Sequence, residues 1–186
     1  GYIYIHDMSA RRDTMNCCLF DVASVLKGGF EMGNIWYNEP KSLDVAFDVI
    51  GDIVMAAASQ QYGGFTVPEV DKILAPYAEK TYERQYERYI CMGLSLEKAR
   101  EEAKKDVKSD FEQGFQGWEY KFNTVASSRG DYPFITVTTG LGTSEFEKMA
   151  TLACLKTRSG GQGKKECKKP VLFPKIVFLY DENLHG

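Results

Sequence analysis

The sequence predicts an α/β protein in which short strands alternate with long helices. Two segments, residues 42–61 and 95–122, place apolar residues at helical spacing. Other short runs, such as "FITVTT" at 134–139, are rich in β-branched and aromatic residues, which favour strands. Gly-rich turns separate the two kinds of segment. The chain has 186 residues, 44% of them hydrophobic, which is enough for one globular unit with a real core.

The first third of the chain is predicted to contain two strands and two helices. Residues 2–5 and 14–20 have strand composition, and residues 22–30 can form a short helix that ends at a Gly-Gly pair. A longer helix is expected over residues 42–61, and Gly63-Gly64 stop it. The apolar positions of this helix are Leu43, Ala46, Ile50, Ile53, Val54 and Ala57.

The middle of the chain is predicted to form two further helices. One starts after Pro68 and runs through "YAEKTYERQYERY". Ser95 is the expected N-cap of the next, a long charged helix. That helix carries an aromatic stripe that consists of Phe111, Phe115, Trp118 and Phe122. A stripe at helical spacing more often packs into a core than binds a ligand, so we expect it to be core.

After Asn123 the pattern changes to turns and strands. A turn, "SSRGDYP", precedes the strand at 134–139, and "GLGTSEFEKMATLACLKTR" is a Gly-rich turn followed by a helix capped at Thr143 or Ser144. The turn has the context of an anion-binding helix N-terminus, but it lacks the lysine of a P-loop and the third glycine of a dinucleotide fingerprint. A tight turn is therefore favoured. "SGGQGKKECKK" is interpreted as a basic, solvated loop, and "VLFPKIVFLY" as a last buried strand.

Charge and cysteine content argue against several classes of function. The formal net charge of −3 gives no general attraction to nucleic acid. Five cysteines without a C-x-x-C pair indicate neither a disulfide framework nor a zinc site, so no metal is expected. The lack of an export signal and of a long apolar run favours a cytoplasmic protein with reduced thiols and no membrane partner. Both ends look cut, as in an excerpt of a longer chain.

Two adjacent cysteines, Cys17 and Cys18, lie in the predicted strand "DTMNCCLFDV". Consecutive Cα atoms lie about 3.8 Å apart, whereas a disulfide needs about 4.4–6.8 Å, so the two are poorly placed to bond to each other. In a strand they point to opposite faces. One of them can line a pocket while the other packs into a hydrophobic layer. The alternative is that both are small buried hydrophobes.

Ten short motifs follow one another along the chain: "YIHD", "NCCL", "GGFEMGN", "EPKS", "SQQYGG", "DKILAPYAEKTY", "YKFNT", "SSRGDYPF", "GLGTSEFE" and "PKIVF". Together they resemble the anaerobic ribonucleoside-triphosphate reductases, the oxygen-sensitive class III enzymes that use a glycyl radical. The resemblance runs from about Gly1 to Tyr180. The family's catalytic fold is a ten-stranded α/β barrel made of two half-barrels. The resemblance therefore implies that residues 1–186 are a single unit, the first part of a larger catalytic barrel domain.

The resemblance implies a catalytic role for Cys17. Reduction of a ribose at C2′ needs a thiol beside that position, and the family places a cysteine on its first barrel strand. In "NCCL" the matching residue is Cys17, so Cys18 faces away from the barrel lumen, and Asn16 is assigned to the substrate. A free cysteine has a pKa near about 8.5 and is mostly protonated at neutral pH, as hydrogen-atom chemistry requires.

The other parts of the radical chemistry are expected beyond this chain. The family's finger-loop cysteine, its glycyl radical and its zinc-binding cysteines lie in segments after residue 186, and an iron–sulfur S-adenosylmethionine activase installs the radical. Cys91, Cys154 and Cys167 match none of these motifs and are interpreted as structural or incidental. The reductant is either formate or a thioredoxin-like dithiol protein. This piece alone is not expected to turn over.

The resemblance also implies an allosteric nucleotide site. The family forms homodimers that bind ATP or a deoxynucleoside triphosphate near the subunit interface, and the effector chooses the ribonucleoside triphosphate substrate. The matching effector positions are Tyr4, His6, Asn38, Lys41, Asp52 and Arg84. Lys41 and Arg84 suit a triphosphate because charge-assisted contacts are strong. Ser127, Ser128 and Arg129 are expected to contact the substrate at the barrel mouth; the alternative is a plain helix end and turn.

Two other classes of protein fit parts of the pattern. A non-catalytic nucleotide-binding and dimerisation module, derived from such a reductase, would keep the effector positions without turnover. A glycyl-radical enzyme of the pyruvate formate-lyase kind would carry its own finger-loop cysteine motif, which this sequence lacks. The reductase interpretation accounts for more of the motifs than either alternative.

Overall fold

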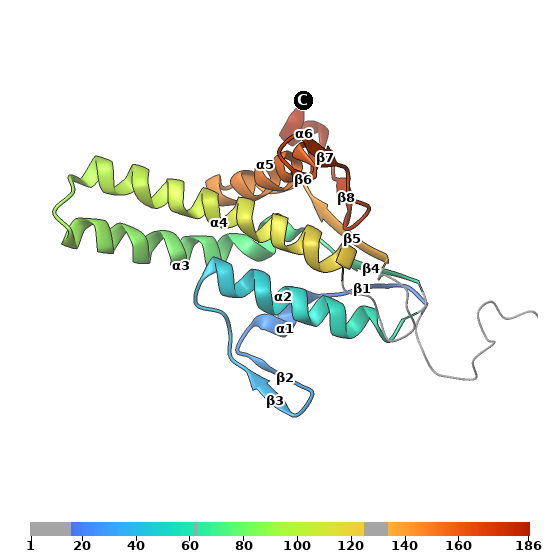
Figure 1. Cartoon of the computed structure of the whole chain (residues 1–186). Coiled ribbons are helices and arrows are strands. Elements are labelled where there is room, and N and C mark those ends of the chain that lie inside the picture. Colours follow the sequence, from blue (N-terminus) through green and yellow to red (C-terminus); the bar gives the residue numbers. More distant parts are fainter. Residues whose placement is uncertain (1–15, 62, 125–133) are drawn as a thin grey trace, which may run out of the picture.

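The computed structural model describes residues 16–61, 63–124 and 134–186. Its centre is a parallel sheet with the strand order β1-β4-β5-β8, and two antiparallel hairpins, β2–β3 and β6–β7, lie outside it (Figure 1). The strands are β1 Cys18–Leu19, β2 Phe30–Met32, β3 Ile35–Tyr37, β4 Gly64–Val67, β5 Phe134–Thr139, β6 Gln162–Lys164, β7 Cys167–Lys169 and β8 Lys175–Phe178. The helices are α1 Val22–Leu26, α2 Leu43–Ala58, α3 Val70–Cys91, α4 Leu96–Thr124, α5 Glu145–Gly160 and α6 Glu182–His185. The predicted α/β class, with strands alternating with long helices, is confirmed.

The sheet has one covered and one exposed face. Side chains alternate between the two faces along each strand, and residues paired in the register share a face. Phe65 of β4 pairs with Ile135 of β5, and both are fully buried in the single hydrophobic cluster beneath the helices. On the opposite face Leu19 is 76% exposed, Phe134 51% and Val177 43%. The described chain therefore covers the sheet from one side.

Helix α4 packs against α2 through Phe47. The Phe47 ring lies so close to Gly114 that a Cβ added there would come within 2.2 Å of it. The indole Nε1–H of Trp118 donates a 2.8 Å hydrogen bond to the Phe47 carbonyl, and the rings of Phe111 and Phe115 meet the Phe47 ring edge-on. The aromatic stripe of α4 is therefore core, as predicted.

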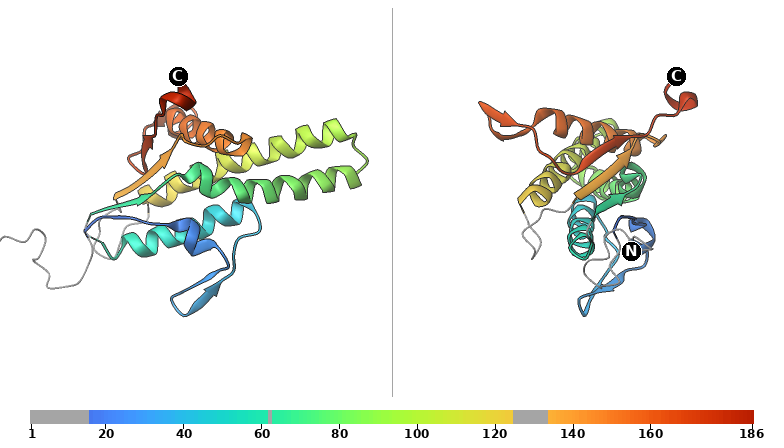
Figure 2. Two further views of the ribbon diagram at one scale, coloured as in Figure 1. Left: turned by 180° about the vertical axis from the view of Figure 1, so that it is seen from behind. Right: turned by 90° about the vertical axis from the view of Figure 1, so that its right-hand side faces the viewer.

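Helices α3 and α4 form a long antiparallel hairpin that extends past the sheet (Figures 1 and 2). On α4 the small residues Ala99 and Ala103 are fully buried, so the two helices can approach closely. Near the tip, the Tyr89 hydroxyl donates a 2.8 Å hydrogen bond to the Asp106 carboxylate. Among the described residues, no helix combines the length and the apolar character that a membrane crossing needs.

The starts of α2 and α5 are fixed in different ways. Ser144 begins α5, as predicted, and forms a capping box with Glu147, in which each residue accepts the other's backbone N–H. Helix α2 begins after Ser42, but the Ser42 side chain makes no capping bond. Instead, the Thr81 hydroxyl of α3 accepts the Leu43 N–H at 2.8 Å. The start of α2 therefore depends on a tertiary contact with α3.

Several predicted strands differ from the observed ones. Within the described residues, the strand expected at 14–20 is shorter than predicted and consists of β1 alone. The strand expected at 2–5 lies outside the described residues. The prediction of a buried strand over 171–180 is wrong in extent and burial, because β8 covers four residues and is an edge strand with one face open. The basic segment expected as a loop forms the β6–β7 hairpin. Strand β4 and the β2–β3 hairpin were not predicted.

Candidate functional site

The cysteine pair lies at the amino end of β1, an edge strand of the sheet. Cys17 is exposed, whereas Cys18 is half-buried and packs against the hydrophobic cluster. The Gly64 N–H donates a 3.2 Å hydrogen bond to the Cys17 Sγ atom, and the Gln61 side-chain amide lies 2.8 Å from the Cys18 Sγ atom. Both thiols are free. The Cys17 side chain is therefore open to solvent, whereas the Cys18 side chain is partly covered by the hydrophobic cluster.

The substrate residues expected from the sequence are only partly described. Asn16 is exposed, and its carbonyl accepts the Gly63 N–H at 2.7 Å. Ser127, Ser128 and Arg129 lie outside the described residues. The chain is described again from Phe134 at the start of β5, which pairs with Gly64, the residue that contacts Cys17. The start of β5 and the exposed Cys17 thiol therefore lie at the same end of the sheet, where its parallel strands begin.

Two of the expected effector residues, Asn38 and Lys41, are exposed in the segment between β3 and α2. Glu39, between them, fixes this segment. Its carboxylate accepts the Gly28 N–H at 3.0 Å and forms a 3.0 Å ion pair with Lys80 of α3. The Gly28 N–H, and then Lys80, hold the pKa of Glu39 below its usual range. Sequence reasoning missed Glu39, although it belongs to the motif "EPKS".

The other two expected effector residues that the structure describes, Arg84 and Asp52, lie apart. Arg84 of α3 lies near Asp44 in the first turn of α2, where the pKa of Asp44 is lowered first by a hydrogen bond from Ser42 and further by the Arg84 charge. Asp52 lies about 12 Å further along α2 and forms a 3.2 Å ion pair with Lys121 of α4. The structure therefore brings Arg84 toward the start of α2 and separates Asp52 from it. Tyr4 and His6 lie outside the described residues.

A groove between α2 and α4 is acidic. Its volume is about 310 Å³, and its charged lining residues are three carboxylates, Asp44, Asp48 and Asp110, and one lysine, Lys121, which pairs with Asp52. Burial, and then repulsion from Asp44 and Asp106, raises the pKa of Asp110. Like charges this close disfavour a bound triphosphate. An anionic effector near α2 would therefore bind outside this groove.

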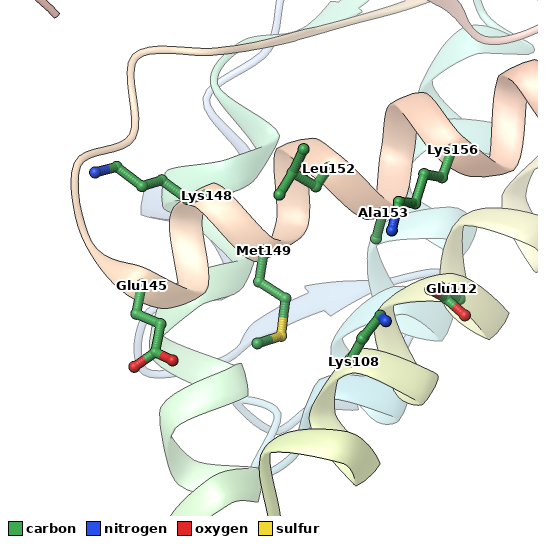
Figure 3. A pocket seen from close by; sticks show the side chains of 8 residues that line it. All are labelled: Lys108, Glu112, Glu145, Lys148, Met149, Leu152, Ala153 and Lys156. Atoms are coloured by element: carbon green, nitrogen blue, oxygen red, sulfur yellow. The ribbon is translucent and has the colours of Figure 1, made fainter. Parts of the chain in front are cut away.

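A second groove, of about 370 Å³, lies between α4 and α5 (Figure 3). Met149 points from α5 toward α4 in its centre, with charged side chains around it. The lining residues are Lys108, Glu112, Glu145, Lys148, Met149, Leu152, Ala153 and Lys156. Its lining contains no Ser, Thr, Cys or His, and the described part of the chain holds no group of three or more His, Cys, Asp or Glu placed to bind a metal. The sequence patterns had not indicated this groove.

Asp71 holds the Gly-rich turn after β5. Its buried carboxylate accepts the N–H groups of Gly140 at 2.9 Å and Gly142 at 3.1 Å. Glu147 accepts the next two backbone N–H groups. The donors of "GLGTSEF" that could bind an external anion are thus used by the protein's own carboxylates. The structure agrees with the tight turn that the sequence favoured.

The other cysteines differ in exposure. Cys154 on α5 is buried, and burial raises the pKa of its thiol to about 12, so it is unreactive at neutral pH. Cys91 is exposed at the last residue of α3, and Cys167 is exposed in β7. A buried, protonated Cys154 agrees with the structural role expected for it.

The parallel sheet and the free thiol at its first strand define an α/β protein with a candidate cysteine site on the uncovered side. The sequence pattern of the anaerobic ribonucleoside-triphosphate reductases matches residues 1–185. The chain belongs to this family.

Relatives and a solved structure agree with this assignment. Over its whole length the chain is 37% identical to the anaerobic ribonucleoside-triphosphate reductase of Enterobacteria phage T4, 35% to that of Haemophilus influenzae and 33% to that of Escherichia coli. It spans 30% of the phage protein and 26% of each of the other two. The anaerobic ribonucleotide reductase from Thermotoga maritima, solved with dATP and CTP, has a similar fold. The TM-score is 0.60 at 17% identity, over 84% of this chain and 27% of that one.

Proposed function

We propose that the protein to which this chain belongs reduces ribonucleoside triphosphates to 2′-deoxyribonucleoside triphosphates under anaerobic conditions. The observation that carries the proposal is the exposed thiol of Cys17 at the start of β1, in a chain of the reductase family. Strand alternation places Cys17 on the uncovered side of the sheet, where Leu19 and Phe134 are exposed, whereas Cys18 packs against the core. Cys17 is therefore the thiol proposed to face the substrate.

The proposed reaction balances as a two-electron reduction. The C2′–O bond breaks, the hydroxyl takes up a proton and leaves as water, and a C2′–H bond forms. The two electrons come from formate or from a dithiol protein. A glycyl radical in the longer protein, installed by the activase, would initiate the radical chemistry. Zinc would be bound only by cysteines outside this chain. The role of Cys17 is to hold a hydrogen on sulfur beside C2′ and to protonate the leaving hydroxyl.

The segment before α2 is proposed to bind a triphosphate effector in a homodimer. Lys41 is exposed there, and Arg84 of the neighbouring helix lies near the start of α2. The ion pair of Glu39 with Lys80 keeps the segment in place without using Lys41. The dATP and CTP named with the Thermotoga maritima structure support nucleotide binding in the family. Asp52 is less suited to this role because it pairs with Lys121 on α4.

Substrate contacts are proposed for Asn16 and for Ser127, Ser128 and Arg129, which the sequence predicts to lie in a turn. The support is that this turn precedes Phe134, which pairs with Gly64 next to Cys17. Arg129 offers a forked cation that suits a phosphate group. Substitution of Arg129 by Ala in the full-length protein should then raise the substrate KM without changing dimerisation.

The decisive experiment compares Cys17→Ser with Cys18→Ser in the full-length, activated reductase. Loss of deoxynucleotide formation is expected for Cys17→Ser only, and Cys18→Ser should cost mainly thermal stability. A normal rate with Cys17→Ser would contradict the catalytic assignment. If effectors also drove dimerisation without any binding of substrate, the chain would instead belong to a regulatory module.

A further inference from the structure

The segment that leads from α2 into β4 contacts Cys18 of β1 and Cys17 just before it. Gly63 donates its N–H to the Asn16 carbonyl at 2.7 Å, and Gly64 donates its N–H to the Cys17 Sγ atom at 3.2 Å. The Gln61 side chain contacts the Cys18 thiol on the covered side of the sheet. The two neighbours of Cys17 in the chain, Asn16 and Cys18, are therefore held by direct contacts. The Cys17 thiol itself accepts a hydrogen bond from the Gly64 N–H.

Gly63 leaves no room for a side chain at this contact. A Cβ added at Gly63 would lie 2.5 Å from the Cys17 Sγ atom, 2.4 Å from the Asn16 Oδ1 atom and 2.8 Å from the Asn16 carbonyl oxygen. Since one of the close atoms belongs to the backbone of Asn16, the strand that carries Cys17 would have to shift.

The neighbouring glycine differs. A Cβ added at Gly64 would meet only the Phe134 carbonyl oxygen, at an ordinary 3.8 Å. Alanine at position 64 keeps the N–H that points at Cys17. The two adjacent glycines therefore form a matched pair, in which only the first is in steric contact with the thiol.

We propose that Gly63 is a positioning residue for the Cys17 thiol. The bare Gly63 backbone lets the chain lie against residues 16–17, and the Gly64 N–H then fixes the direction of the Cys17 Sγ atom on the uncovered face of the sheet. The consequence for catalysis rests on the proposed function of Cys17. The positioning itself is a property of the folded chain and can be measured without turnover.

The test compares Gly63→Ala with Gly64→Ala in the full-length protein under anaerobic conditions. The rate of alkylation of Cys17 by iodoacetamide is followed by peptide mass spectrometry, with the exposed Cys91 as the internal reference. Gly63→Ala should change the Cys17 rate several-fold relative to Cys91, and Gly64→Ala should leave it near the wild-type rate. In turnover, Gly63→Ala should lower kcat by roughly 10- to 100-fold with little change in KM, because misplacement of a reacting group by about 1 Å can cost this much.

Unchanged alkylation in Gly63→Ala, or equal changes in both variants, would overturn the proposal. If Gly63→Ala is too unstable to assay, its loss of melting temperature is compared in wild-type and Cys17→Ala backgrounds. Removal of the sulfur should relieve part of the loss, and an equal loss in both backgrounds would count against the proposal. Altered alkylation together with an active Cys17→Ser enzyme would refute the catalytic role of Cys17 and leave its positioning by Gly63 intact.

Discussion

The Arg158 side chain donates from Nε to the Glu119 carboxylate across 2.7 Å, and this ion pair joins the C-terminal ends of α5 and α4. Glu119 is 3% exposed. The same guanidinium donates to the carbonyl oxygens of Val171 and Pro174, which precede β8, and the other Glu119 oxygen accepts the Gln162 side-chain amide. This pair of a half-buried cation and a buried carboxylate therefore connects two helices, the β6–β7 hairpin and the segment that leads into the last strand of the sheet.

Removal of Arg158 should destabilise the fold strongly. Arg158→Ala leaves the Glu119 carboxylate buried without its partner, and such a loss costs about 3–5 kcal/mol. Urea unfolding followed by circular dichroism measures the change. The control is Lys104→Ala, which removes the exposed 2.7 Å pair with Glu145 and should cost at most about 1 kcal/mol. Similar losses for the two variants would show that burial of the Arg158 pair has little energetic effect.

The two glycines of α4 should respond to alanine in opposite directions. Gly114→Ala drives a methyl group into the Phe47 ring and should destabilise the protein by about 1–3 kcal/mol. Nothing lies within 4 Å of the Cβ position of Gly117, so Gly117→Ala should stabilise the helix by about 0.5–1 kcal/mol. Thermal unfolding of both variants checks the prediction. An unchanged melting temperature for Gly114→Ala would contradict the close packing of α4 against Phe47 of α2.

Asp110 should make the protein less stable as the pH rises. Burial, and then the Asp44 and Asp106 charges, raise the pKa of Asp110 in the folded state, so the unfolded chain gives up this proton more readily. Its contribution to stability is complete below the unfolded pKa and is lost as the pH rises through the folded pKa. Asp110→Asn should therefore raise the melting temperature at pH 7 and have a smaller effect near pH 3. A pH-independent difference between the two proteins would contradict this cause.

Lys41 should contribute to effector affinity without affecting the chemical step. In the full-length protein, Lys41→Ala is expected to weaken effector binding by about 1.5–3 kcal/mol, the usual size of a hydrogen bond to a charged group. Isothermal titration with dATP measures the loss. Lys98→Ala removes another exposed lysine, at the far end of the α3–α4 hairpin, and serves as the control. Equal affinities in wild type and Lys41→Ala would exclude Lys41 from the effector site.

The parts of the fold that the sequence predicted are those with a long local pattern. Helix α2 and the aromatic stripe of α4 repeat over several turns, and the Ser144 cap of α5 lies beside its own helix. Strand β4 was missed because it has four residues, one of them glycine, and its pairing with β5 lies far along the chain. Strand β8 was expected to be buried because an edge strand and a central strand have the same apolar composition.

The site was predictable to the extent that it depends on strand alternation. Alternation predicts that Cys17 and Cys18 face different sides, and their exposures agree. The contact of Gly63 with Cys17 and the capping of α2 by Thr81 join distant segments, so no local spacing indicates them. The charge pattern likewise does not reveal that Asp52 forms an ion pair with Lys121 of α4.

The α3–α4 hairpin also determines the order in which the molecule can fold. Every pairing in the sheet joins strands that are separated by at least one helix along the chain. Each pairing therefore closes a long loop, and the entropy cost of closure slows its formation. The hairpin needs only contacts between neighbouring helices. Because α4 runs antiparallel to α3, it brings the chain back to the sheet (Figure 2), where the start of β5 pairs with the start of β4. We expect Ala103→Gly to slow refolding in stopped-flow experiments, and Val137→Ala in β5 mainly to speed unfolding. The protruding hairpin would then act as the nucleus that brings the sheet together.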